Sequence, residues 1–120
     1  MAKPLVVIGH RMGKGQRIAK GIEEEGGEAV VIEGMLADMK LGDKMHELNA
    51  DLGLSFCGSG GAGALTAHNK YGYKYKQYQR SADAFASAIK EGCKVVGGPF
   101  MDDEALGRAV VKAYRETYEK

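Results

Sequence analysis

The chain has 120 residues, of which 44% are hydrophobic and 28% are charged, and its formal net charge is +1. This length and composition predict one domain, residues 1–120, and exclude a disordered chain, a collagen-like repeat and a strongly basic surface. The sequence shows no secretory signal, no apolar run of membrane-helix length, and no metal or disulfide spacing for Cys57 and Cys93, so we expect a cytoplasmic protein without membrane insertion, bound metal or cofactor.

Short apolar runs rich in β-branched residues alternate with amphipathic segments along the chain. The runs are typical of buried parallel strands, and the amphipathic segments carry apolar residues at helical spacing. In chain order, the predicted elements are strand 5–8, helix 15–25, strand 29–32, helix 35–49, strand 52–56, helix 62–70, strand 73–78, helix 82–91, strand 94–97 and helix 103–118.

This alternation predicts a three-layer, doubly wound, Rossmann-like α/β sandwich with a five-stranded, mainly parallel sheet. Helix 35–49 could break at Gly42. Ser81 and Asp102 are expected to cap the two helices that follow them, because short polar side chains accept hydrogen bonds from the first helical turn.

Glycine loops mark the expected ligand site. In doubly wound sheets, ligands bind beyond the carboxyl ends of the strands, where the strand order reverses, and loops 9–15 and 57–63 should meet there. The second loop leads into a helix, whose unpaired N–H groups and positive dipole end favour a phosphate or carboxylate. A tight turn that packs the helix onto the sheet would also explain the glycines. The predicted anion-binding residues of this loop are Gly58, Ser59, Gly60, Gly61, Ala62 and Gly63.

Cys57, His10 and Arg11 are the candidate chemical groups. Cys57 precedes a helix N-terminus, a position that favours thiolate, although small buried cysteines are also common structural residues. His10 could transfer protons and Arg11 could bind an anion in bidentate fashion, unless both are solvated loop residues. Lys14 is a weaker candidate, and Asn69 completes the predicted ligand-binding set.

Residues 71–80 mix tyrosines with basic residues. A net charge near zero argues against a nucleic-acid surface, so we expect no nucleic-acid partner. Tyrosines on an amphipathic strand favour packing against a second copy, and we expect a homodimer.

Over nearly its full length the chain resembles the small bacterial proteins of the glycine-rich SFCG family, after Ser55-Phe56-Cys57-Gly58. Genes of that family accompany predicted transport proteins and sugar-acid catabolic enzymes. The resemblance therefore implies a role in carbohydrate uptake or breakdown, with transport-system proteins as partners.

Cys57-Gly58-Ser59-Gly60 and residues 67–72 are also similar, more distantly, to type B ribose-5-phosphate isomerases and galactose-6-phosphate isomerase subunits. That resemblance implies Cys57 as the proton-transferring base and Ser59, Gly60 and Gly61 as the anion cradle. The chain departs from the pattern because no aspartate precedes His10, no histidine lies in residues 82–91, and the C-terminal arginine-bearing extension is missing unless Arg115 substitutes for it.

Three functions are open on these grounds. The first is binding of a small anionic metabolite, a phosphorylated sugar or sugar acid, because the anion loop is intact and the catalytic set is incomplete. The second is aldose–ketose isomerisation with Cys57 as base. The third is phosphotransfer in a sugar transport system, with Cys57 as phosphocysteine.

Overall fold

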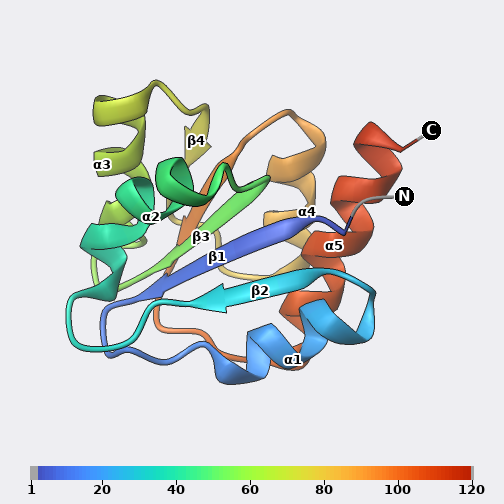
Figure 1. Ribbon diagram of the computed structural model, residues 1–120, viewed down its shortest axis with the longest axis horizontal. Coiled ribbons are helices and arrows are strands. Elements are labelled where there is room, and N and C mark those ends of the chain that lie inside the picture. Colours follow the sequence, from blue (N-terminus) through green and yellow to red (C-terminus); the bar gives the residue numbers. More distant parts are fainter. Residues whose placement is uncertain (1–2, 120) are drawn as a thin grey trace.

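A computed structural model describes residues 3–119. Five strands form one wholly parallel sheet in the order β2-β1-β3-β5-β4, with helices on both faces (Figure 1). This is a doubly wound α/β fold, so the predicted fold class is confirmed. The elements are β1 Leu5–His10, α1 Gln16–Glu24, β2 Glu28–Val31, the 3₁₀ helix η1 Ala37–Lys40, α2 Leu41–Leu48, β3 Leu52–Phe56, α3 Ala62–Tyr71, β4 Tyr75–Lys76, α4 Ala82–Lys90, β5 Val95–Gly98 and α5 Glu104–Tyr118.

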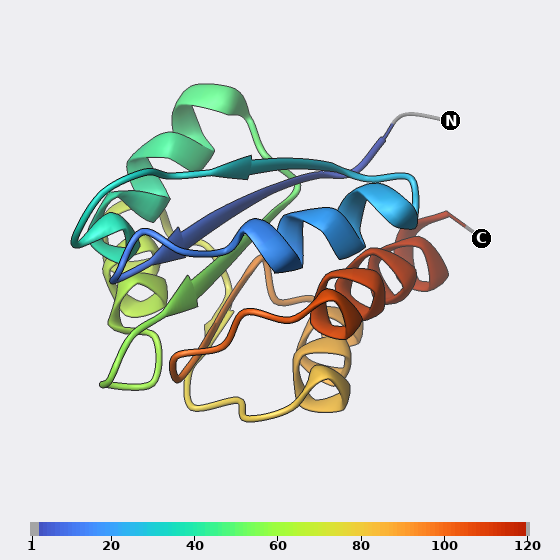
Figure 2. The same ribbon diagram turned by 90° about the horizontal axis from the view of Figure 1, so that it is seen from below.

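Two apolar layers hold the sheet between its helices. Helices α1, α4 and α5 cover one face, and η1, α2 and α3 cover the other (Figure 2). Strand β1 supplies both layers, because Val6 and Ile8 point into the first and Val7 points into the second. A strand buried on both faces must be a continuous apolar run, which is what residues 5–8 are.

Glycines bring neighbouring helices into close contact. A Cβ atom on Gly21 of α1 would lie 2.0 Å from the Glu104 carbonyl oxygen of α5, and one on Gly107 of α5 would lie 2.1 Å from the Ile18 carbonyl oxygen. Side chains at these two positions would force α1 and α5 apart. These glycines therefore serve the packing of the fold and not the ligand site.

The predicted helix 35–49 is replaced by two shorter helices. Leu36 adopts a left-handed backbone conformation with φ of 62°, η1 follows, and α2 begins at Leu41, one residue before the expected break at Gly42. The predicted strand 73–78 is also shorter, because only Tyr75–Lys76 pairs with β5 at the sheet edge.

Helix capping follows the prediction at one position and departs from it at another. Ser81 accepts a hydrogen bond from the Ala84 N–H, as expected. The cap of α5 is Asp103, which accepts from the Leu106 N–H at 2.8 Å, and not Asp102.

In the part of the chain that the structure describes, no helix has both the length and the apolar character needed to cross a membrane.

Candidate functional site

The strand order reverses between β1 and β3. The chain passes from β1 to its neighbour β2 and then crosses to β3 on the other side of β1. The loops that leave the carboxyl ends of β1 and β3 therefore meet, and the Arg11 N–H donates to the Phe56 carbonyl oxygen at 2.8 Å between them. This edge is therefore the topological switch point of the sheet, where doubly wound folds bind their ligands.

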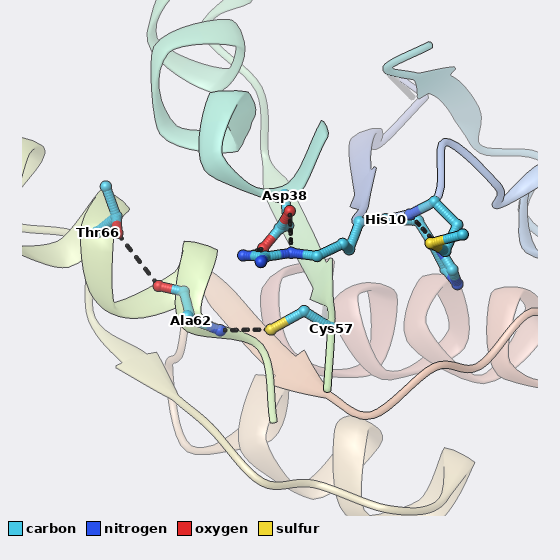
Figure 3. A network of polar contacts seen from close by, with 7 residues as sticks. His10, Asp38, Cys57, Ala62 and Thr66 are labelled. Carbon is cyan, nitrogen blue, oxygen red and sulfur yellow. Dashed lines mark hydrogen bonds and ion pairs between the residues drawn. The ribbon is translucent and has the colours of Figure 1, made fainter. Parts of the chain in front are cut away.

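Strand alternation separates His10 from Cys57. His10 pairs in register with Phe56, and both side chains point toward the α1, α4 and α5 face. Cys57 is one residue further along and belongs to the opposite face, where its side chain turns toward Ala62 and away from His10 (Figure 3). The two candidate catalytic residues, Cys57 and His10, therefore lie on opposite faces of the sheet.

Arg11 lies on the same face as Cys57 and is held by Asp38. Its Nε and one terminal nitrogen donate to the two carboxylate oxygens of Asp38, at 3.2 and 2.9 Å. The Asp38 side chain is fully buried, whereas that of Arg11 is 36% exposed. The hydrogen bonds and negative charge of Asp38 raise the pKa of Arg11, and the nearby Cys57 adds a smaller effect of the same sign. Arg11 is thus a fixed positive charge at the strand end.

Cys57 is 1% exposed, and its sulfur accepts the backbone N–H of Ala62 at 3.2 Å (Figure 3). Ala62 is the first residue of α3, so the thiol satisfies one of the N–H groups that a helix leaves unpaired. Thr66, one turn further on, donates its hydroxyl to the Ala62 carbonyl oxygen at 3.2 Å. Sulfur, helix N-terminus and threonine form one chain of contacts.

Packing accounts for several glycines of the loop. Gly60 and Gly61 have positive φ of 75° and 93°, and a Cβ atom would lie 2.2 Å from the Tyr78 ring at Gly60 and 2.3 Å from the Gly97 Cα atom at Gly61. At Gly63 a Cβ atom would meet the Asp38 carbonyl oxygen at 2.0 Å. Gly58 is different, because its nearest neighbour would be the Phe100 ring at 3.5 Å.

The loop also leaves backbone donors without partners. Within residues 3–119, the N–H groups of Gly58, Ser59, Gly61 and Gly63 donate to no protein acceptor, whereas the Gly60 N–H donates to the Cys57 carbonyl oxygen at 3.1 Å. Unpaired donors at the start of a helix favour an anion.

A cavity of about 280 Å³ and a second of about 230 Å³ open near this edge of the sheet. The smaller one is lined by the glycine loop and by Arg80, an exposed residue whose guanidinium makes no hydrogen bond or ion pair to any residue from 3 to 119. We call it the loop cavity. Its lining residues are Gly58, Ser59, Gly60, Tyr78, Pro99 and Arg80.

His10 faces the larger cavity, which we call the histidine cavity. Its Nδ1 atom accepts the Met12 N–H at 3.1 Å. Burial lowers the pKa of His10 below its ordinary 6.5, and Asp102 opposes that shift with its negative charge. The ring is therefore neutral near pH 7 and carries its proton on Nε2.

The other predicted site residue lies elsewhere. Asn69 is exposed on the last turn of α3, away from both cavities. Among the described residues, no group of three or more His, Cys, Asp or Glu side chains is placed to hold a metal ion.

Sequence reasoning missed the residues that other elements contribute to the edge. Asp38 lies in a segment without a motif, and Arg80 ends the tyrosine-rich basic run 71–80, which we considered only as a nucleic-acid or subunit surface; the fold places both at this edge. The sequence could have indicated Asp102, because the notable pair Asp102-Asp103 precedes a helix. We assigned it to the wrong helix, since Asp102 accepts the N–H groups of Arg17 and Ile18 in α1, at 3.1 and 3.0 Å.

Comparison with known proteins gives one family and one fold. The family described as glycine-rich SFCGS, the letters of residues 55–59, matches residues 5–117. No curated protein matches the chain.

Three solved structures show the same fold at low identity. Type B ribose 5-phosphate isomerase of Trypanosoma brucei has 17% identity and a TM-score of 0.68, over 98% of this chain and 87% of that one. The Trypanosoma cruzi enzyme has 14% and 0.69, over 97% and 85%. Ribose-5-phosphate isomerase B of Mycoplasma genitalium, with bound ribulose-5-phosphate, has 15% and 0.66, over 98% and 86%.

Proposed function

This chain belongs to the glycine-rich SFCGS family, and we propose that its loop cavity binds the phosphate group of a phosphorylated sugar or sugar acid. The observation that carries the proposal is the meeting of two kinds of free donor. Backbone N–H groups of Gly58 and Ser59 lack protein acceptors within residues 3–119, and Arg80, which lines the same cavity, has no partner for its guanidinium among those residues. A phosphate would satisfy both at once.

The fold comparison supports a sugar phosphate as the first ligand to test. The Mycoplasma genitalium structure contains ribulose-5-phosphate on a similar fold. A phosphate also suits Arg80 better than a neutral sugar does, because a guanidinium binds a phosphate through charge-assisted hydrogen bonds.

Titration calorimetry with ribose-5-phosphate and with inorganic phosphate tests this function. We expect saturable binding, and we expect Arg80→Gln to weaken it by about tenfold or more, since a hydrogen bond to a charged group contributes roughly 1.5–3 kcal/mol. Lys112→Gln, which removes one exposed charge from α5, is the matched control and should bind like the wild type. Absence of saturable binding, or equal affinity in Arg80→Gln, would refute the proposal.

A second candidate is aldose–ketose isomerisation with Cys57 as base. It is favoured by the position of the thiol, at the end of β3 beside the loop and on the same sheet face as Arg11. A thiolate would take a proton from the carbon beside the substrate carbonyl and return it to the neighbouring carbon, so that no redox partner is needed. His10 would take no part in this transfer, because it lies on the other face.

Solvent exchange decides between binding and isomerisation. An isomerase would incorporate deuterium from heavy water at carbon-bound positions of ribose-5-phosphate, and Cys57→Ala would abolish this incorporation. If the wild-type protein binds the sugar phosphate without exchange, the isomerase candidate is wrong and the binding function stands.

Four further expectations stay predictions. They are the phosphocysteine role of Cys57, the association with transport-system proteins, the homodimer and the cytoplasmic location. Mass spectrometry of Cys57 after incubation with a phosphodonor tests the first of them, and an unmodified thiol would contradict it.

A further inference from the structure

The histidine cavity has a different chemical character from the loop cavity. It is lined by three residues with apolar side chains and by a histidine, a lysine and an aspartate. Its lining residues are His10, Met12, Lys14, Phe100, Met101 and Asp102.

The polar groups of this cavity include both donors and an acceptor. His10 has Nδ1 occupied by the Met12 N–H, so its free group is the Nε2–H donor. Lys14 makes no hydrogen bond or ion pair to residues 3–119. Asp102 uses Oδ1 for two backbone N–H groups of α1, and its Oδ2 accepts from no group in the described chain.

Such a set suits hydroxyl groups. Each hydroxyl both donates and accepts, so a polyhydroxylated chain needs neighbouring donors and acceptors, and its C–H groups need an apolar wall. An inorganic anion would be disfavoured here, because the Asp102 carboxylate already occupies the N-terminus of α1.

Phe100 stands between the two cavities. Its ring lines the histidine cavity, with its centroid 5.5 Å from that of His10, and its edge would lie 3.5 Å from a Cβ atom on Gly58 of the glycine loop. The preceding residue, Pro99, lines the loop cavity. Phe100 is nevertheless 52% exposed, so part of this residue is accessible to a ligand that passes over it.

We propose that the two cavities are the two ends of one extended site for a phosphorylated sugar. The phosphate lies at the glycine loop and Arg80, the carbon chain crosses Phe100, and the hydroxyl groups reach His10, Lys14 and Asp102. This inference rests on the proposed function, and it adds which end of the ligand each cavity holds.

Calorimetry with three probes tests the arrangement. Ribose-5-phosphate, inorganic phosphate and ribose are titrated at constant salt into the wild type and into Lys14→Gln, Phe100→Ala and Lys112→Gln. We expect ribose-5-phosphate to bind at least about tenfold more tightly than inorganic phosphate, and ribose more weakly than either. Lys14→Gln and Phe100→Ala should each reduce the preference for ribose-5-phosphate by about threefold or more, whereas Lys112→Gln should keep it.

Amide chemical shifts give a second readout that does not depend on variants. Ribose-5-phosphate should shift the N–H signals of Met12 and Lys14 as well as those of Gly58 and Ser59, whereas inorganic phosphate should shift only the latter pair.

The outcomes separate this inference from the proposed function. Equal affinity for ribose-5-phosphate and phosphate, with shifts confined to the glycine loop, would overturn the extended site and leave phosphate binding intact. Binding of neither probe would overturn both. An unchanged preference in Lys14→Gln and Phe100→Ala would also overturn the extended site.

Discussion

Gly61 offers the sharpest test of how the glycine loop is built. Its φ is 93°, and a Cβ atom there would lie 2.3 Å from the Gly97 Cα atom and 2.8 Å from two further backbone atoms of β5. Because backbone atoms of a central strand cannot turn aside as a flexible side chain can, we expect Gly61→Ala to destabilise the fold.

Three contributions determine how much Gly61→Ala lowers the free energy of unfolding. Left-handed backbone costs an L-residue about 1–2 kcal/mol, and overpacking costs about 1–3 kcal/mol. The lower entropy of the unfolded alanine chain offsets about 0.4–1 kcal/mol. The net loss in the free energy of unfolding is therefore about 1–4.5 kcal/mol, which for a chain of this size lowers Tm by roughly 4–18 °C.

Gly34 provides a matched control for this measurement. Its φ is also 93°, yet no atom lies within 4 Å of the Cβ position. Gly34→Ala therefore carries the backbone cost and the entropy offset without the clash, and the difference between the two variants in guanidinium denaturation isolates the contact with Gly97. If Gly61→Ala and Gly34→Ala are equally stable, the inference that the β5 backbone leaves no room for a side chain at Gly61 is wrong.

Two further predictions concern the charged groups of the site. Burial lowers the pKa of His10 below 6.5 in the folded state, so folding favours the neutral ring, and this stability is lost as pH falls below 6.5. Thermal melts should show a steeper loss of Tm between pH 7 and pH 5 in the wild type than in His10→Asn, whose Oδ1 can still accept the Met12 N–H; parallel profiles would contradict the buried neutral ring. Arg11→Gln should destabilise the protein more than the double variant Arg11→Gln/Asp38→Asn, because the single variant leaves a buried carboxylate without its guanidinium. A double variant less stable than Arg11→Gln in urea denaturation would refute that reasoning.

The sequence predicted the strands, helices and layers of the fold better than it predicted which side chains contact one another at the site. Apolar runs and helical spacing determine which segments are strands and helices, and these patterns are local. Residues 73–78 are the exception. Their tyrosines have strand-forming character, but only an edge position was available to a segment with exposed lysines, and pairing stops after two residues.

Side-chain direction at the strand ends was the main error in the site. We expected β1 to end at Ile8, which left the direction of His10 and Arg11 undetermined. In the structure the strand continues to His10, so alternation sends His10 to one face and Arg11 to the other. A difference of two residues in the end of a strand therefore decides which of two predicted site residues joins Cys57.

No local sequence pattern could have predicted the hydrogen-bond partners of the residues at this edge. Asp38 is 27 positions from Arg11, and Asp102 is 85 positions from Arg17. Such pairs form because the sheet order brings their loops to one edge. Capping preferences alone could not distinguish whether Asp102 serves the helix that follows it or one that lies beside it.

The crowding of the glycine loop has a consequence for how this family can diversify. Gly60, Gly61 and Gly63 are confined by Tyr78, Gly97 and Asp38, so a side chain at any of them must be accommodated by a change elsewhere in the fold. Gly58, Ser59 and Arg80 are exposed and can vary without that demand. Relatives that prefer different ligands should therefore share the three crowded glycines and differ at the three exposed positions. A designer who wishes to alter the ligand should begin with the exposed positions.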